Sequence, residues 1–127
     1  MPLSLPNLSA HWYAECVPHT DSTMLQLRRP EWAAHPETFA LLHTDYQTAG
    51  RGQRGTVWES APGENLLFGI VFRPTFLPAA QQFHLSEALA LAVADAVRPY
   101  ADGISVKWPN DIYWHDRKLA GILLEHT

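Results

Sequence analysis

The chain is organised around one stretch, Asp45-Tyr46-Gln47-Thr48-Ala49-Gly50-Arg51-Gly52-Gln53-Arg54-Gly55-Thr56-Val57-Trp58. Its centre holds three glycines and two arginines. Glycine lets the backbone take positive φ and lets a ligand approach the main chain closely, and successive amide groups in such a loop can form an anion-binding concavity. Guanidinium groups grip phosphate oxygens bidentately. The stretch therefore indicates a loop for a phosphate-bearing ligand, with an ordinary surface loop carrying solvated arginines as the alternative.

Strands are predicted on both sides of this loop. Residues 38–44 read as a buried strand that leads directly into it, and residues 65–72 read as a strong strand after it. Two strands that flank a long loop favour an antiparallel connection. Residues 11–17 are aromatic and β-prone and predict a further strand.

A short helix is predicted after Asp21-Ser22-Thr23, over residues 24–27, with Asp21 or Ser22 as its N-cap. We expect Pro30 to end this helix and residues 31–37 to form a loop. A long helix is predicted over residues 78–100, because apolar residues recur there with a period close to 3.6. The apolar positions are Phe83, Leu85, Ala88, Leu89, Ala92, Val93, Ala96 and Val97, and we assign this helix a structural role.

The second informative stretch follows the long helix. Residues 103–108 predict a strand, Pro109-Asn110 bends or bulges it, and residues 111–114 continue it. Residues 115–118 are predicted to form a polar hairpin turn, and residues 119–124 are predicted to form the strand that runs back after it. The only lysines of the chain are Lys107, on the strand, and Lys118, in the turn. Lys118 in a turn favours a solvated side chain.

Three segments together resemble the biotin protein ligases. They are the glycine-arginine loop with Trp58, then Lys107-Trp108-Pro109-Asn110-Asp111, and then Arg117-Lys118-Leu119-Ala120-Gly121-Ile122-Leu123. The resemblance runs roughly from residue 21 to residue 125. It implies an α+β fold, with a mixed, largely antiparallel sheet packed on helices, like that of class II aminoacyl-tRNA synthetases. It also implies an ATP-dependent ligase that activates biotin as biotinyl-5′-AMP. That enzyme then transfers biotin to a lysine of a biotin carboxyl carrier protein.

The resemblance also implies roles for particular residues. Catalytic roles fall to Lys107 and Arg51. The residues implied in biotin binding are Ser22, Thr23, Gln47, Gly50, Arg51, Lys107 and Gly121. Those implied in ATP or adenylate binding are Arg51, Gln53, Arg54, Gly55, Trp58 and Asn110.

Several of these positions keep a second interpretation. Ser22 and Thr23 could cap the helix as well as bind the ligand, and Trp58 could anchor the loop instead of covering an adenine. Asp111 could orient Lys107 or support the Mg²⁺ that accompanies ATP. Gln53 departs from the family, which often has arginine at this position.

Composition narrows the function classes. The chain has 127 residues and a net charge of −4, which argues against a binder of duplex nucleic acid. Its one cysteine, Cys16, cannot form an internal disulfide. This fits a reducing compartment and a buried, inert thiol. The seven histidines show no metal-ligand spacing. No leader or membrane-spanning run is evident, and we expect a cytoplasmic protein.

The sequence predicts one domain over residues 1–127, corresponding to the front part of a ligase catalytic domain. We expect neither an N-terminal DNA-binding domain nor a C-terminal β-domain. An incomplete sheet would leave an edge for a homo-oligomer or a domain swap and would weaken activity. The alternative functions are a lipoate ligase or octanoyltransferase relative and a non-catalytic module that binds biotin or its adenylate.

Overall fold

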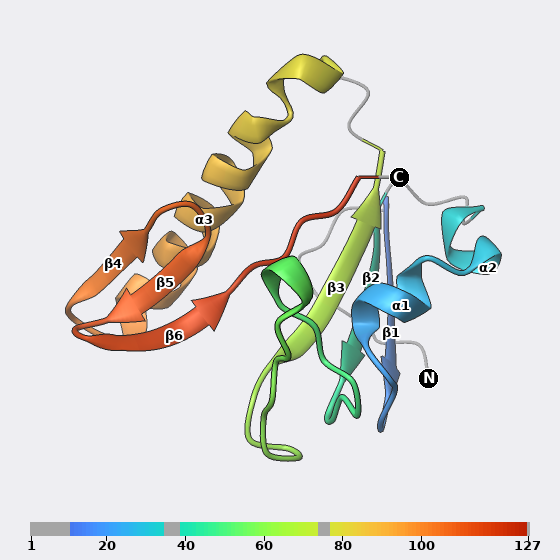
Figure 1. Cartoon of the computed structure of the whole chain (residues 1–127), viewed down its shortest axis with the longest axis horizontal. Coiled ribbons are helices and arrows are strands. Elements are labelled where there is room, and N and C mark those ends of the chain that lie inside the picture. Colours follow the sequence, from blue (N-terminus) through green and yellow to red (C-terminus); the bar gives the residue numbers. More distant parts are fainter. Residues whose placement is uncertain (1–10, 35–38, 74–76, 127) are drawn as a thin grey trace. The chain divides into compact units, whose positions relative to one another are not determined.

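The computed structural model describes residues 11–34, 39–73 and 77–126. Its contacts divide the chain into two compact units, residues 1–74 and residues 75–127. Figure 1 shows the elements of each unit. The expectation of a single domain stays a prediction. The structure is a mixed α+β arrangement, which confirms the predicted fold class.

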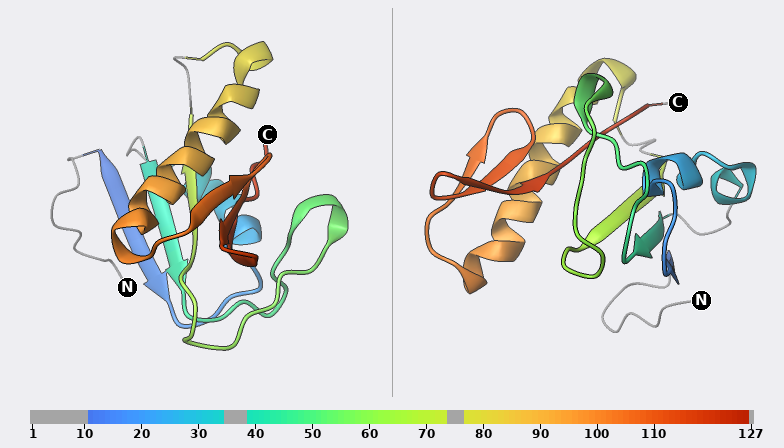
Figure 2. Two further views of the ribbon diagram at one scale, coloured as in Figure 1. Left: turned by 90° about the vertical axis from the view of Figure 1, so that its left-hand side faces the viewer. Right: turned by 60° about the horizontal axis from the view of Figure 1, so that its bottom comes forward.

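The first unit is built on a sheet of β1 (Trp12–Val17), β2 (Phe39–Thr44) and β3 (Leu67–Phe72), in that order. β1 runs parallel to β2, and β3 runs antiparallel to β2, with Phe39 opposite Phe72. The three predicted strands and the antiparallel connection around the loop are therefore confirmed. Figure 2 shows the loop that joins β2 to β3 standing away from the sheet.

Two short helices, α1 (Thr23–Leu27) and α2 (Pro30–Ala33), pack on one face of this sheet. Ser22 caps α1, because its hydroxyl oxygen accepts a hydrogen bond from the Leu25 amide at 3.0 Å. The prediction that Pro30 ends a helix was wrong. α1 ends at Leu27, and Pro30 instead opens α2 at its first position, where a missing amide proton costs nothing.

The core of the first unit joins Leu27 of α1 and Trp32 of α2 to Ala40 and Leu42 of β2. Gly69 of β3 makes this packing possible. A Cβ at Gly69 would lie 2.6 Å from the Leu27 side chain and 3.2 Å from the Thr23 hydroxyl, so any larger residue would force the Leu27 side chain to shift. Cys16 lies outside the core: it is half-buried, with its sulfur 3.3 Å from Nδ1 of His43. The expectation of a buried thiol was therefore wrong.

The second unit contains the long helix α3 (Phe83–Val97), preceded by a 3-10 turn at Ala79–Gln81 and followed by another at Arg98–Tyr100. The helix is confirmed, but the predicted apolar face was only partly right. Ala90 and Ala94 are the buried positions, at 1% and 0% exposure, whereas Phe83 is exposed. The alanines bury because their small side chains let the sheet approach the helix.

The sheet beside α3 consists of β4 (Ile104–Lys107), β5 (Asp111–Trp114) and β6 (Arg117–Gly121). All neighbours are antiparallel, and α3 lies behind the sheet in Figure 1. The prediction that residues 111–114 continue the preceding strand was wrong, because they form a separate strand antiparallel to it. Trp108-Pro109-Asn110 forms a turn that reverses the chain, so that Lys107 stands opposite Asp111. Proline and asparagine are both residues that turns favour.

The β5–β6 pairing contains a β-bulge. Ala120 lies opposite Ile112 and Lys118 lies opposite Tyr113, so Leu119 is the extra residue. Lys118 is therefore part of β6, and its predicted place in a turn was wrong. Within the described residues, no helix combines the length and the apolar character needed to cross a membrane.

Candidate functional site

The loop after β2 is a narrow, twisted hairpin. Arg51 and Val57 form an antiparallel bridge, and the Trp58 amide donates to the Gly50 carbonyl at 2.8 Å. The Gly52 amide donates to the Thr56 carbonyl at 2.8 Å. These amides are used inside the hairpin, so they do not contribute to the anion-binding concavity that the sequence suggested.

The tip of the loop presents Arg54 to solvent. Arg54 has φ 54° in the left-handed region, next to Gly55 at φ 77°. Its side chain is exposed and forms no ion pair with any residue that the structure describes. An exposed guanidinium without an ion pair can donate hydrogen bonds to a phosphate oxygen without first breaking an internal bond. Arg51 and Gln53 are also exposed.

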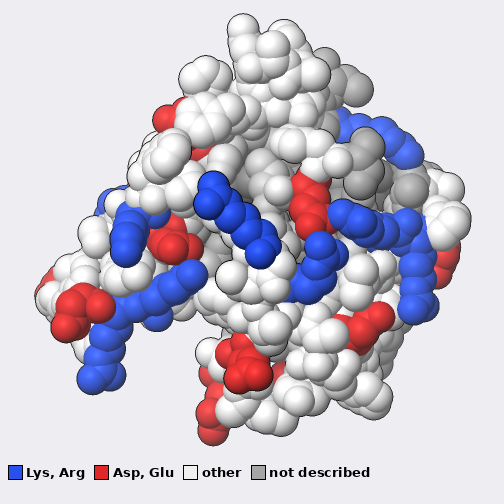
Figure 3. Space-filling model, viewed as in Figure 1, with Lys and Arg blue, Asp and Glu red and all other residues white. Residues whose placement is uncertain are grey.

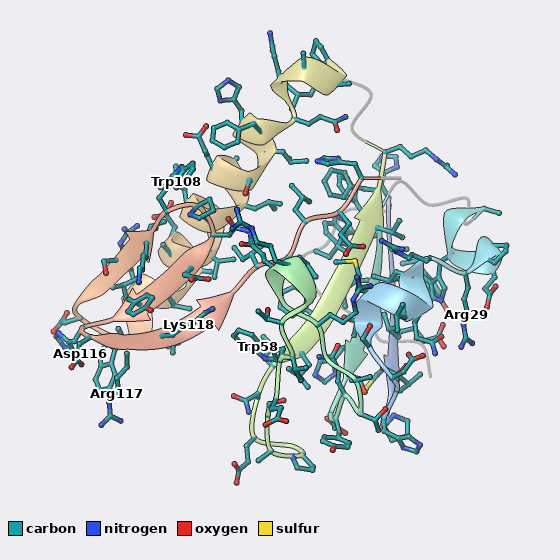
Figure 4. The ribbon with its side chains drawn as sticks, viewed as in Figure 1. Arg29, Trp58, Trp108, Asp116, Arg117 and Lys118 are labelled. Atoms are coloured by element: carbon teal, nitrogen blue, oxygen red, sulfur yellow. The ribbon has the colours of Figure 1, made fainter. Side chains whose placement is uncertain are left out.

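The base of the loop borders a cavity of about 470 Å³. Three of the predicted ligand-binding residues line it: Gln47, Gly50 and Trp58. Figure 4 labels Trp58 at the end of the loop, beside β3. The remaining lining residues are Tyr46, Thr48, Val57, Glu59, Ser60, Ala61 and Pro62. The structure thus brings part of the predicted biotin set together with the predicted adenine-facing tryptophan.

The Asp21-Ser22-Thr23 turn is joined directly to the start of the loop. The Thr20 amide donates to the Tyr46 carbonyl at 3.1 Å, and the Ala49 amide donates to the Asp21 carbonyl at 2.7 Å. Gln47 Oε1 accepts from the Thr23 amide at 2.9 Å and lies 3.3 Å from the Thr23 hydroxyl. Gln47 is therefore bound to Thr23, the residue that follows Ser22 in the turn.

The hydroxyls of Ser22 and Thr23 are both buried. Ser22 is 1% exposed and caps α1, and Thr23 is 6% exposed. Capping uses the Ser22 hydroxyl oxygen as the acceptor for the Leu25 amide. Their contact with biotin stays a prediction.

Asp21 holds the turn in place through hydrogen bonds to one carboxylate oxygen. Oδ1 accepts from the Ser22 amide at 2.6 Å and from the Thr20 hydroxyl at 3.0 Å. The Ser22 bond is the main cause of a lowered pKa at Asp21, and the Thr20 bond adds to it against the opposing effect of burial. Hydrogen bonds to a carboxylate favour its charged form.

A lowered pKa makes the stability of this turn depend on pH. The stabilisation is present above the ordinary carboxyl pKa of about 4 and is lost as pH falls through the lower folded value. We expect urea midpoints of the wild type to fall between pH 5 and pH 2 more steeply than those of Asp21→Asn. Equal slopes for the two proteins would show that Asp21 does not carry this dependence.

Lys107 is placed at the end of β4, directly before the turn. Its ammonium lies 5.3 Å from the centroid of the Tyr113 ring, at a cation–π distance. It forms no ion pair among residues 11–34, 39–73 and 77–126. Trp108, exposed beside it, leans on Phe83 of α3 with ring centroids 6.1 Å apart. The strand thus presents Lys107 as a positive charge from a rigid element.

Asp111 is engaged by the second lysine. Its Oδ1 lies 3.0 Å from Nζ of Lys118, and both side chains are a little over one-third exposed. Within the described residues no group of three His, Cys, Asp or Glu side chains could hold a metal ion. A lone carboxylate that is already paired does not fit a protein-held Mg²⁺, and we assign no metal to Asp111.

The other predicted residues of this unit differ in their surroundings. Asn110 is 5% exposed, and its Nδ2 donates to the Ile122 carbonyl at 2.8 Å. Its Oδ1 is buried without a hydrogen-bond partner among the described residues. Gly121, the last residue of β6, lies opposite Asp111. Asn110 thus ties the turn to the segment after β6, and its adenylate contact stays a prediction.

The comparisons with known proteins agree on the family. The sequence matches the Biotin/lipoate A/B protein ligase family over residues 13–127. The chain belongs to this family. It is 48% identical over 84 residues to the bifunctional ligase/repressor BirA of Escherichia coli, which is 65% of this chain and 26% of that protein. It is 36% identical over 89 residues to the biotin–[acetyl-CoA-carboxylase] ligase of Mycobacterium tuberculosis, covering 67% of this chain and 34% of that protein.

The fold of this family member is also similar to that of a solved biotin protein ligase. The biotin protein ligase of Leishmania major in complex with biotin matches with a TM-score of 0.78 and 25% identity. The match covers 94% of this chain and 53% of that one. The chain thus spans about a quarter to a third of these curated relatives and about half of this solved structure.

Sequence reasoning missed three features of the site. Tyr113, which contacts Lys107, was not singled out, although its alternation with Asp111 on one strand was a usable signal. The ion pair of Lys118 depends on the bulge, which no residue pattern in the sequence marks. The tight contact of Gly50 with the Trp58 backbone depends on how the hairpin closes.

Proposed function

We propose that this chain is the part of a biotin–protein ligase that activates biotin with ATP. The product is biotinyl-5′-AMP, and the complete enzyme transfers the biotinyl group to a lysine of a biotin carboxyl carrier protein. The observation that carries the proposal is Lys107, an exposed ammonium on a rigid strand with no carboxylate partner among the described residues. It lies in a chain whose relatives are named as biotin ligases.

The first step brings two anions together. A carboxylate oxygen of biotin attacks the α-phosphorus of ATP, the bond to the β-phosphate bridging oxygen breaks, and pyrophosphate leaves. Catalysis of such a transfer is mainly positioning and charge stabilisation. Lys107 supplies a compact positive charge for the oxygens of the α-phosphate. No covalent bond to the enzyme is needed.

The second step uses the product of the first. The neutral amine of the acceptor lysine attacks the carbonyl carbon of the mixed anhydride, AMP leaves, and the amine loses a proton as the amide forms. This chain contributes by keeping the adenylate bound and away from water until the acceptor arrives. The acceptor protein and this transfer are inferred from the names of the relatives.

The loop residues complete the proposed roles in the first unit. Arg51 and Arg54 bind phosphate oxygens, and Trp58, at the cavity beside Gln47, covers the adenine. Gly55 permits the turn that exposes Arg54. Gln53 is neutral at a position where the family often has arginine, so this loop holds an adenylate with one charge fewer. Mg²⁺ enters this proposal only together with ATP.

The ligand choice is supported by relatives, because the Leishmania major ligase was solved with biotin and with biotinyl-5-AMP. A lipoate ligase or octanoyltransferase relative is the second candidate, since the matched family includes lipoate enzymes. A non-catalytic binding module remains a third. Location in the cytoplasm, absence of nucleic-acid binding and association into a homo-oligomer or domain swap stay predictions.

Ordering of the loop by the adenylate tests the proposal without requiring turnover. We expect a non-hydrolysable biotinyl-adenylate analogue to slow hydrogen exchange of the amides from Gly50 to Trp58 at least tenfold, because a closed loop shields them from water. The matching lipoyl-adenylate analogue should have a smaller effect. Unchanged exchange with both analogues would contradict adenylate binding, and protection by the lipoyl analogue alone would favour the lipoate enzyme.

A further inference from the structure

The first unit contains a second cavity, of about 370 Å³, which we call the acidic cavity. Residues of β1, β2, α1 and α2 line it, among them Tyr13, Glu15, Glu31 and Trp32. None of its lining residues lines the cavity at the base of the loop, and none is among those assigned to biotin or ATP. Its volume lies in the range of small-ligand sites, roughly 300–1,000 Å³. The acidic cavity is therefore a candidate binding site of its own.

Glu15 reaches the acidic cavity because of its place on β1. Tyr13 and Val17 pack against the core of the first unit, and because side chains alternate along a strand, Glu15 points to the same face. A carboxylate on the core-facing side of a strand is uncommon. Its Oε2 accepts a hydrogen bond from the Tyr13 hydroxyl at 2.9 Å. No described residue donates to its other oxygen, Oε1, so a further donor can bind there.

The lining of the acidic cavity carries negative charge. Glu31, in the first turn of α2, is its second carboxylate, and no described lysine or arginine belongs to the lining. Neither Glu15 nor Glu31 forms an ion pair with any described residue. Arg28 and Arg29, between the two helices, are exposed and lie outside the lining. Figure 3 shows blue side chains on the surface over α1 and α2. The cavity itself therefore favours a cation.

The spacing of these groups indicates which kind of cation fits. Glu15, Glu31 and His19 all line the cavity, yet no three described His, Cys, Asp or Glu side chains could hold one metal ion. The rings of Tyr13 and Trp32 lie with centroids 6.0 Å apart and planes tilted by 54°. Aromatic faces attract cations and also offer apolar surface to an aliphatic stem. Lysine and arginine side chains combine a cationic head with such a stem.

The Trp32 indole supplies a hydrogen-bond donor that the fold leaves unused. Trp32 is 9% exposed, and its indole N–H has no hydrogen-bond partner among residues 11–34, 39–73 and 77–126. In this part of the chain Asn110 Oδ1 is the one enclosed side-chain atom without a partner, so the Trp32 N–H reaches open space. Trp32 lines the acidic cavity. A main-chain carbonyl that arrives with a basic side chain can accept this bond, whereas a free alkylamine brings no acceptor.

We propose that the acidic cavity binds a lysine or arginine side chain of a partner polypeptide. The ammonium or guanidinium group of the partner contacts Glu15 and Glu31. The aliphatic stem rests on the rings of Tyr13 and Trp32, and a main-chain carbonyl of the partner accepts from the Trp32 N–H. This inference goes beyond the proposed function and does not depend on it, because it uses none of the residues assigned to biotin or ATP.

The test follows the indole N–H signal of Trp32 by proton–nitrogen NMR of the 127-residue chain, with Trp32→Phe to assign the signal. The probe is Nα-acetyl-lysine methylamide, which carries the basic side chain and its flanking carbonyls. We expect it to shift the Trp32 signal in a saturable way. Butylamine, which lacks the carbonyls, should bind about fivefold more weakly. Nα-acetyl-norleucine methylamide, which keeps the stem and the carbonyls but has no charge, should bind at least tenfold more weakly.

Two substitutions connect the NMR signal to the carboxylates. Glu15→Gln keeps an oxygen acceptor for the Tyr13 hydroxyl and should weaken binding of the lysine probe about three- to tenfold. Glu31→Gln, at an exposed position, should weaken it about two- to fivefold. Glu64→Gln is the matched control, because Glu64 is an exposed carboxylate of the same unit that lines neither cavity, and it should bind the probe as the wild type does.

The dispersion of the NMR signals checks the fold of each variant, and Glu31→Gln on the surface of α2 decides the question if Glu15→Gln disturbs β1. A Trp32 signal that no probe shifts would overturn the proposal. Unchanged affinity in both glutamine variants, or equal binding of the norleucine derivative, would show that the cavity does not select a cation. Equal binding of butylamine would assign the site to a free amine and overturn the polypeptide partner.

Discussion

Lys107→Ala should reduce biotin-dependent pyrophosphate exchange about 100- to 1,000-fold, the usual effect of removing one preorganised charge from a transition state. Lys107 is held by β4 at the start of a tight turn, and among the described residues its ammonium contacts the Tyr113 ring and no carboxylate. The charge is thus in place before the reaction begins. A group that acts mainly in the transition state changes kcat far more than it changes binding.

The controls for this prediction separate charge from structure. Biotin affinity, measured by calorimetry, should change less than about threefold in Lys107→Ala, and Arg117→Ala should keep the wild-type exchange rate. Lys107→Arg tests geometry, because a guanidinium keeps the charge but spreads it over a planar fork. Equal loss of biotin affinity and exchange in Lys107→Ala would show a ground-state binding role instead.

Gly50→Ala should destabilise closure of the loop by about 2 kcal/mol, within the usual range for forcing an extra methyl group into a packed site. A Cβ at Gly50 would overlap the backbone carbonyl oxygen of Trp58, and it would lie 2.9 Å from Nε2 of Gln47. The Trp58 backbone cannot move aside without breaking the hydrogen bond that the Trp58 amide donates to the Gly50 carbonyl. Exchange of the Trp58 amide should therefore speed up about 30-fold.

Gly52→Ala is the matched control in the same loop. A Cβ at Gly52 would meet the Thr56 side chain, which can rotate at the cost of its hydroxyl bond to the Gln53 carbonyl. We expect a cost below about 1 kcal/mol, since one exposed hydrogen bond is lost. Trp58 exchange that responds equally to both substitutions would show that the Gly50 contact does not hold the loop closed.

The sequence predicted the elements that depend on local pattern. β1, β2, β3 and α3 were found because apolar and β-branched residues recur with the period of their element. Roles for Ser22, Thr23 and Gln47 were expected only through the family resemblance, and the hydrogen bond between Thr23 and Gln47 depends on the pairing of distant segments. No local pattern reports such pairing.

The errors share one physical cause, which is that chain direction and register are tertiary properties. Pro30 is compatible with ending one helix or opening the next, and packing of Trp32 into the core favours the second. Residues 108–110 could bend a strand or reverse it, and the pairing of β4 with β5 decides this. The single extra residue at Leu119 then determines which face carries Lys118.

Exchange of labelled pyrophosphate into ATP tests the central claim most directly, because it detects formation of an acyl adenylate and names the acid that is activated. The account predicts exchange that depends on biotin, does not occur with lipoate, and falls to background in Lys107→Ala. Exchange that depends on lipoate instead, or biotin-dependent exchange that survives in Lys107→Ala, would contradict it.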